Sequence, residues 1–371
     1  MKKIKFIELN YHYHSELSNP EAVIEKHKPS NLFAEELKNK ADVLLVKHMS
    51  KEGELEKSEI RYRFFHRRNS FWQIPRATHR FIAAQQPDMV LVQGFIFPLQ
   101  VVALRKLLGK QTVIVLQHHG EVPFKRKRIF QRIADKSVNG YLFSTTELAR
   151  PWIEKGIIKN TGKCFELPPA STTFLKQDKN QCRRLTGMNS GTNFLWAGRL
   201  NANKDPITVL TALEKYFALY PDASLYMIYQ ENDLLEEVKK RIENSTLLKE
   251  RVRLIGHIEY SKMETWYSAA DYIISASHHE GGSYVLMEAV ACGCVPVVSH
   301  IPASIKSIDN GRLGYSFEKG DPESLYTVLA SLNDASQQEK ATACMEYFNK
   351  ELSAAAIADK ILAIYNWLQF K

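Results

Sequence analysis

Runs of apolar residues alternate with amphipathic segments along the whole chain. In the first half, the apolar runs predict strands at residues 4–8, 43–46, 60–65, 89–92, 112–116, 140–143 and 164–167. Residues 74–84 and 99–108 have the spacing of amphipathic helices. Runs such as VLLV, MVLV and VIVL are apolar at every position, as are strands buried on both faces of a parallel sheet. The alternation therefore predicts an α/β domain with crossover helices.

The second half of the chain repeats this pattern. Its apolar runs predict strands at residues 194–197, 225–229, 253–255, 272–276 and 295–299. Two helices are expected to begin at the pairs Asp205-Pro206 and Asp321-Pro322, because aspartate caps free amides and proline suits the first helical position. We therefore expect an α/β protein with two Rossmann-like, doubly wound domains facing across a cleft. In such folds ligands lie outside the carboxyl ends of the strands.

A polar segment at residues 176–192 separates the two halves. It contains Gly and Ser, has no clear periodicity and predicts the domain linker. We accordingly expect an N-terminal Rossmann-like domain over residues 1–180 and a C-terminal one over residues 181–350. Residues 351–371 are rich in Ala, Ile and Leu and predict a C-terminal helix that packs back on the N-terminal domain.

The composition of the chain is that of a globular protein with an excess of positive charge. The chain has 371 residues, of which 44% are hydrophobic and 25% charged, which is typical of globular domains. Its formal net charge of +9 favours an anionic partner, such as a phosphorylated small molecule, an acidic membrane surface or nucleic acid. The five cysteines are scattered and odd in number, which favours a reducing, cytoplasmic compartment. No stretch reads as a signal peptide or a transmembrane helix.

The most informative motif covers residues 279–293, between two predicted strands. Glu280 and Glu288 are separated by seven residues, so Glu280 falls in a loop and Glu288 on the following helix. Glycines before the helix allow backbone to approach a ligand closely, and the first turn of a helix favours a phosphate. These glycines are Gly281 and Gly282, and the residues expected to open the helix are Ser283, Tyr284 and Val285.

A second motif, Ala-Gly-Arg-Leu-Asn-Ala-Asn-Lys-Asp, follows the first strand of the second half. Gly198 allows a tight turn, Arg199 offers a planar fork to phosphate oxygens, and Lys204 offers a mobile charge. Together the two cations can neutralise a diphosphate. A third motif, Gln-His-His-Gly, follows the strand TVIVL. Either His118 or His119 can face a ligand there, because adjacent residues leave a strand on opposite sides.

These motifs resemble those of the retaining GT-B glycosyltransferases, in particular glycosyltransferase family 4 (glycosyl transferases group 1). The common family form EGFGLVLLEAMACG corresponds to EGGSYVLMEAVACG here. The resemblance implies that Glu280 binds the hydroxyls of the donor sugar and Glu288 the nucleotide ribose. It assigns Arg199 and Lys204 to the donor diphosphate, and a histidine, for which we choose His119, to the reacting sugar. Gly256 and His257 resemble the segment near the base.

The resemblance is clear over residues 191–332 and looser over residues 112–174. It implies retaining transfer from a UDP- or GDP-sugar to a hydroxyl of a glycan or lipid-linked acceptor, in bacterial-type cell-surface glycan or glycolipid synthesis. The C-terminal domain would hold the donor and the N-terminal domain the acceptor. No cofactor is expected, since the nucleotide sugar is a substrate. Two segments depart from the family, namely the glycine-free residues 10–15 and the residues 229–232, where relatives have glycines.

Three further expectations concern partners. Paired histidines suggest a metal, but neighbours on a strand point apart and no Asp-x-Asp is present, so we expect none. The basic segment 124–133 has two interpretations. It either contacts the inner face of an anionic membrane peripherally, or it is an ordinary helix docked on the sheet with a solvated basic end. No nucleic-acid partner is expected. The rival functions are a nucleotide-sugar epimerase or hydrolase, and a non-catalytic basic binding protein.

Overall fold

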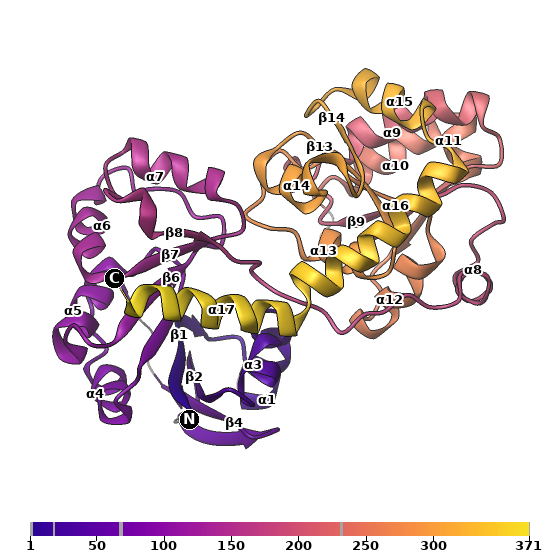
Figure 1. Cartoon of the computed structure of the whole chain (residues 1–371). Coiled ribbons are helices and arrows are strands. Elements are labelled where there is room, and N and C mark those ends of the chain that lie inside the picture. Colours follow the sequence, from indigo (N-terminus) through magenta and orange to yellow (C-terminus); the bar gives the residue numbers. More distant parts are fainter. Residues whose placement is uncertain (1–2, 18, 67–69, 231–232, 371) are drawn as a thin grey trace. The chain divides into compact units, whose positions relative to one another are not determined.

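The computed structural model describes residues 3–17, 19–66, 70–230 and 233–370, which form two compact units (Figure 1). Unit 1 comprises Met1–Ser171 and Ser353–Lys371, and unit 2 comprises Thr172–Leu352. Each unit has its own parallel sheet with helices, as the alternation of apolar runs predicts.

Unit 1 contains an eight-stranded sheet of order β3-β4-β2-β1-β5-β6-β7-β8, parallel except for the β3–β4 pair. Its strands are β1 (Ile4–His14), β2 (Ala41–Met49), β3 (Gly53–Lys57), β4 (Ile60–Phe65), β5 (Met89–Gln93), β6 (Val113–Gln117), β7 (Gly140–Phe143) and β8 (Cys164–Glu166). Its helices are α1 (Pro20–Lys26), α2 (Lys28–Asn31), α3 (Phe33–Leu37), α4 (Arg76–Gln85), α5 (Pro98–Leu108), α6 (Arg128–Ala134), α7 (Arg150–Glu154) and α17 (Ala354–Gln369).

The C-terminal helix α17 belongs to unit 1. It packs against α3 and β6, and Figure 1 shows it in yellow beside α3. Ile357, Ile361 and Ile364 are buried at helical spacing in the core that they share with Phe33. Lys40 Nζ lies 2.5 Å from Asp359 Oδ1. One apolar stripe therefore attaches a segment from the far end of the sequence to this core.

Unit 2 contains a six-stranded parallel sheet of order β11-β10-β9-β12-β13-β14. Its strands are β9 (Asn193–Gly198), β10 (Ser224–Tyr229), β11 (Val252–Gly256), β12 (Tyr272–Ser275), β13 (Val295–Ser299) and β14 (Tyr315–Phe317). Its helices are α8 (Lys179–Thr186), α9 (Pro206–Leu219), α10 (Leu235–Glu243), α11 (Thr246–Arg251), α12 (Tyr260–Ala269), α13 (Tyr284–Ala291), α14 (Pro302–Ser307), α15 (Pro322–Ala330) and α16 (Asp334–Tyr347). Asp205 and Asp321 cap α9 and α15 with their side chains, as expected.

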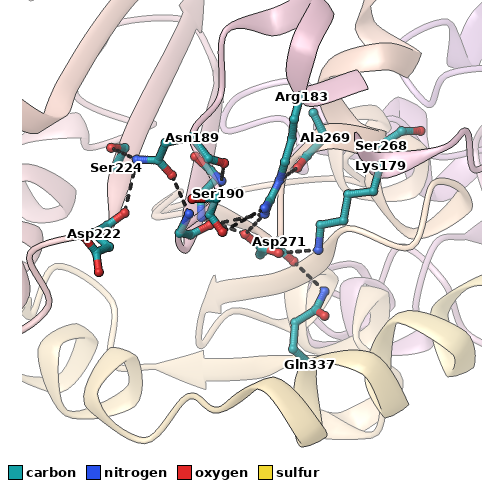
Figure 2. Close-up of polar contacts among 12 residues, drawn as sticks. Lys179, Arg183, Asn189, Ser190, Asp222, Ser224, Ser268, Ala269, Asp271 and Gln337 are labelled. Atoms are coloured by element: carbon teal, nitrogen blue, oxygen red, sulfur yellow. Dashed lines mark hydrogen bonds and ion pairs between the residues drawn. The ribbon is translucent and has the colours of Figure 1, made fainter. Parts of the chain in front are cut away.

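The expected linker at residues 176–192 is wrong, because this segment is a folded part of unit 2 that contains α8. The unit boundary lies between Ser171 and Thr172. Figure 2 shows Lys179 and Arg183 of α8 pointing at Asp271, whose carboxylate forms an ion pair with each. Asp271 Oδ2 also accepts from the backbone N of Asn193 at 2.7 Å. A single buried carboxylate thus ties α8 to the amino ends of β9 and β12.

The first strand is longer than its apolar run. The predicted strand 4–8 is too short, because β1 continues through most of the glycine-free segment 10–15 to His14, with a shift of register between Leu9 and Tyr13. Tyr11 is fully buried and its hydroxyl lies 2.7 Å from His79 Nε2. Polar residues of this segment therefore remain in the sheet because they find partners inside unit 1. Two short strands, β3 and β14, were not expected at all.

Candidate active site

The first candidate loop follows β9. Gly198 ends the strand, Arg199 is exposed, and Leu200 is fully buried and anchors the turn. Asp205 has a φ of 43° and caps α9 by accepting from Thr208 N at 3.1 Å and from Thr208 Oγ1 at 2.7 Å. The half-buried Lys204 therefore occupies the end of a loop that is fixed to both a strand and a helix.

The second candidate loop joins β12 to α13 and is hydrogen-bonded to the first. Asn203 accepts from His278 N at 2.8 Å through its carbonyl oxygen and from His279 N at 3.1 Å through Oδ1. Its Nδ2 donates to the carbonyl oxygen of His279 at 3.1 Å. Strands β9 and β12 are neighbours in the sheet, so their carboxyl ends bring together loops that lie 76 residues apart in the sequence. The sequence analysis missed Asn203, which joins the two motifs.

Glu280 and Lys204 form an ion pair in which both side chains are largely buried. Glu280 Oε1 also accepts from Ser277 Oγ at 2.8 Å. The resemblance assigned Lys204 to the donor diphosphate and Glu280 to the donor sugar. The ion pair places the two expected ligand-binding groups in contact, so a diphosphate would compete with Glu280 for the Lys204 ammonium.

Glu288 lies on α13 and is 4% exposed. Its Oε1 accepts from Tyr260 Oη at 2.8 Å and its Oε2 from Tyr267 Oη at 3.0 Å. Burial raises the pKa of Glu288 to about 7, although both tyrosine hydroxyls favour the ionised form. The carboxyl is therefore held in a fixed orientation and titrates near neutral pH. Neither tyrosine was singled out from the sequence.

The segment expected near the base is linked to Glu288 through α12. Gly256 ends β11 with a φ of 77°, which suits glycine, and the exposed His257 follows it. Tyr260, whose hydroxyl binds Glu288, is the first residue of α12 and is partly exposed. Its ring lies 5.0 Å from that of Phe174. Tyr260 thus contacts Glu288 from the start of the helix that follows Gly256 and His257 in the sequence.

The first turn of α13 has the form expected of an anion-binding helix start. Ser283 caps the helix, and its Oγ accepts from Leu286 N at 3.3 Å. Gly282 precedes the cap, Tyr284 is exposed and Val285 is half-buried. The positive end of the helix dipole therefore lies directly after the loop that carries Glu280.

In unit 1 the two adjacent histidines have opposite environments. His118 is buried against the rings of Phe95, Phe143 and Trp152. His119, the histidine that we chose for the reacting sugar, is exposed, and its Nε2 lies 2.6 Å from Gln93 Oε1. Loss of solvation around the ring lowers the pKa of His119, and the negative charge of Glu121 raises it in part.

One acid and one amide contact His119, a second acid contacts the amide, and the sequence analysis did not single out any of the three. Glu121 Oε2 accepts from His119 N at 2.6 Å, and its Oε1 accepts from Phe95 N at 3.0 Å. Gln93 also interacts with Glu8, which is fully buried and lies 2.7 Å from Lys47 Nζ. Gln93 is itself 4% exposed. His119 is therefore held by groups at the carboxyl ends of β5 and β6.

Residues 186–350 match the family model described as Glycosyl transferases group 1. This part of the chain is similar to the group 1 glycosyltransferases. It contains every candidate residue of unit 2. The region that matches the family model thus includes both loops that are joined by the hydrogen bonds of Asn203.

Curated relatives of this chain have related names. It is 26% identical over 199 residues to D-inositol 3-phosphate glycosyltransferase 2 of Catenulispora acidiphila, covering 50% of this chain and 47% of that protein. It is 22% identical over 282 residues to GDP-mannose:cellobiosyl-diphosphopolyprenol alpha-mannosyltransferase of Xanthomonas oryzae pv. oryzae, covering 72% of this chain and 71% of that protein. The chain thus matches about half the length of the first relative.

The fold of this chain is GT-B. The structure of Anabaena HepE in complex with UDP and glucose is similar with a TM-score of 0.69 and 13% sequence identity. The match covers 98% of this chain and 100% of that one. At this identity the likeness establishes the architecture of two parallel-sheet α/β domains.

Two findings concern features outside the motifs. Among the residues that the structure describes, no group of three or more His, Cys, Asp or Glu side chains could hold a metal ion. Within the same residues, no helix is long and apolar enough to cross a membrane. The departing segment at residues 229–232 lies partly outside the described residues.

Proposed function

We propose that this chain transfers a sugar, with retention of anomeric configuration, from a nucleoside diphosphate sugar to a hydroxyl of an acceptor. The observation that carries the proposal is the junction of the two motif loops in unit 2. Asn203 holds them together, and Lys204, Glu280 and the first turn of α13 lie at that junction. Diphosphate and sugar chemistry need cations, a helix start and a carboxylate close to one another.

In this proposal Arg199, Lys204 and the first turn of α13 stabilise the charge of the leaving diphosphate. Such stabilisation acts where negative charge develops and is therefore catalytic. Glu280 accepts hydrogen bonds from the sugar hydroxyls, and Glu288 accepts them from the ribose. The acceptor hydroxyl attacks from the face that the diphosphate leaves, and the departing phosphate oxygen takes its proton. No step needs a metal ion, so transfer should persist with a chelator.

For the donor we propose a UDP- or GDP-sugar. One relative is named for GDP-mannose, and the similar solved structure contains UDP and glucose. For the acceptor we propose a glycan or a lipid-linked glycan of bacterial-type cell-surface synthesis, because the same relative is named for a diphosphopolyprenol acceptor. We propose a cytoplasmic location, and the five free cysteines are compatible with a reducing compartment. His119 is proposed to contact the reacting sugar.

Thermal stabilisation by a panel of nucleoside diphosphates and their sugars, with and without chelator, tests the donor site. Ligands that bind the folded state raise its melting temperature by mass action. We expect one nucleotide class to raise it, and Lys204→Ala and Arg199→Ala to weaken the effect. Lys249→Ala, an exposed cation elsewhere in unit 2, is the matched control. If no nucleotide stabilises the chain, or if the control behaves like Lys204→Ala, the assignment is wrong.

Transfer itself is tested on the product. With the donor found in the panel, the anomeric coupling constant of the new glycosidic bond reports retention or inversion. Free sugar in the absence of acceptor would favour the rival hydrolase, and a changed donor sugar would favour the epimerase.

A further inference from the structure

The positive charge of the chain is concentrated in one stretch of unit 1. Between Ile60 and Ala134 there are fourteen Lys or Arg residues, and the only acids are Asp88 and Glu121, so this stretch has a formal charge of +12. The whole chain has +9. The rest of the chain therefore has a formal charge of −3, and the net positive charge comes from this stretch of the sequence.

Large apolar side chains are exposed within the same stretch. Trp72 is 62% exposed, Val122 66%, Ile129 54% and Ile133 47%. Helix α6 buries Gln131 and Ala134, so Ile129 and Ile133, one turn apart, lie on its outer face. The sequence analysis left open that segment 124–133 is an ordinary docked helix. In that case its large apolar residues should face the protein, and these two do not.

An aromatic cluster joins two segments of the sequence into this surface. Phe71 packs edge-on against Trp72, Phe124 and Phe130, with ring centroids 4.9 to 5.7 Å apart. Lys127 Nζ lies 4.3 Å from the centre of the Phe71 ring and 4.9 Å from that of Trp72. Trp72 is thus held in place beside the basic segment while most of its surface is exposed.

We infer that this surface, called here the Trp72 patch and made of Trp72, Val122, Ile129 and Ile133 with the exposed cations Lys125, Arg126 and Lys127, binds a membrane that contains anionic lipids. Lysine and arginine attract anionic headgroups, and tryptophan and aliphatic side chains enter the boundary between headgroups and acyl chains. A nucleic acid or an acidic glycan would satisfy the cations but would leave four large apolar side chains in water. The combination therefore favours a lipid surface. The inference concerns binding and does not depend on the proposed transfer.

Vesicle flotation of the full chain tests the inference. We expect binding to phosphatidylcholine vesicles that contain phosphatidylglycerol, and little binding to pure phosphatidylcholine. Trp72→Ala and the double variant Ile129→Ser/Ile133→Ser should each weaken binding by about tenfold, because each removes apolar area from the interface. Lys125→Glu/Arg126→Glu should weaken it further. Leu219→Ser, which changes an aliphatic residue of unit 2 that is 64% exposed, is the matched control and should bind like the unchanged chain.

Each other outcome overturns the inference. Absence of binding to the anionic vesicles would do so, as would equal binding to neutral vesicles. If the apolar variants bind as well as the unchanged chain while DNA or heparin competes fully, the surface binds polyanions instead of membranes. The melting temperature of each variant, compared with that of Leu219→Ser, separates loss of binding from loss of folding. Because the readout is vesicle binding, a failure of the proposed transferase activity would leave the result interpretable.

Discussion

Replacing Glu288 by glutamine should stabilise the protein at alkaline pH while weakening the donor site. Glu288 is 4% exposed and its pKa is raised from 4.5 to about 7, mainly by burial. In Glu288→Gln the side chain keeps its shape and can still bind Tyr260 and Tyr267, but it is neutral at every pH. The variant therefore removes the cost of an ionised carboxylate in a buried site and retains the packing of α13.

The magnitude follows from linkage. A carboxyl with a raised pKa in the folded state contributes stability below pH 4.5, and this contribution is lost as the pH rises through about 7. The difference between 4.5 and about 7 corresponds to about 3 kcal/mol of unfolding free energy. We expect Glu288→Gln to match the unchanged chain near pH 4.5 and to be more stable by up to about 3 kcal/mol at pH 8.

Urea denaturation at a series of pH values, followed by circular dichroism, measures this difference. The control is Glu250→Gln, which changes an exposed glutamate of unit 2 and should leave the pH dependence unchanged. Parallel stability curves for Glu288→Gln and the unchanged chain between pH 5 and pH 8 would refute the assignment of a raised pKa to this residue. Donor binding by Glu288→Gln should be weaker at pH 8, since ribose hydroxyls lose a charged acceptor.

Three other changes test the remaining contacts. Glu280→Gln should tighten binding of the free nucleoside diphosphate by about threefold, because Lys204 loses its ionic partner, and it should lower the rate of transfer. Titration calorimetry measures the diphosphate binding, and weaker binding by the variant would contradict this prediction. In the unchanged chain, Gln93 Oε1 should hold the proton of neutral His119 on Nε2, and Gln93→Leu should allow both neutral tautomers. The ¹⁵N chemical shifts of the imidazole distinguish these cases. Ile361→Ala should destabilise unit 1 by about 2–4 kcal/mol in urea denaturation, whereas Asp359→Ala, at an exposed ion pair, should cost under about 1 kcal/mol.

The sequence predicts the parallel sheets well because most of their strands contain runs of apolar or aromatic residues. The strands 60–65, 140–143 and 295–299 were placed with the bounds that the structure gives them. It fails where polar residues are stabilised by distant partners. Lys179 and Arg183 look like residues of a solvated linker until Asp271, which lies far along the chain, is brought beside them. β3 reads as GELEK, and it forms because it pairs antiparallel with β4.

At the candidate site, the sequence could predict which strand ends carry the motifs but not what their side chains contact. The order of motifs and strands placed Arg199, Lys204 and Glu280 in two loops of unit 2. That these loops are neighbours depends on the sheet order, in which β9 lies beside β12. The burial of Glu288 could not be predicted, because it depends on Tyr260 and Tyr267, which come from a different helix. The choice of His119 over His118 likewise depends on which side of the strand end is packed against Trp152.

The two glutamates of the motif therefore have different electrostatic environments, although the sequence presents them as a matched pair. The charge of Glu280 is balanced by the Lys204 ammonium, whereas the Glu288 carboxyl is neutralised in part by protonation, since its pKa of about 7 is close to neutral pH. A diphosphate that draws Lys204 away would leave the Glu280 carboxylate to accept hydrogen bonds from sugar hydroxyls. Ribose hydroxyls that donate to Glu288 would favour its ionised form and release a proton. In the proposed function, each part of the donor thus interacts with the acid whose charge it is chemically suited to stabilise.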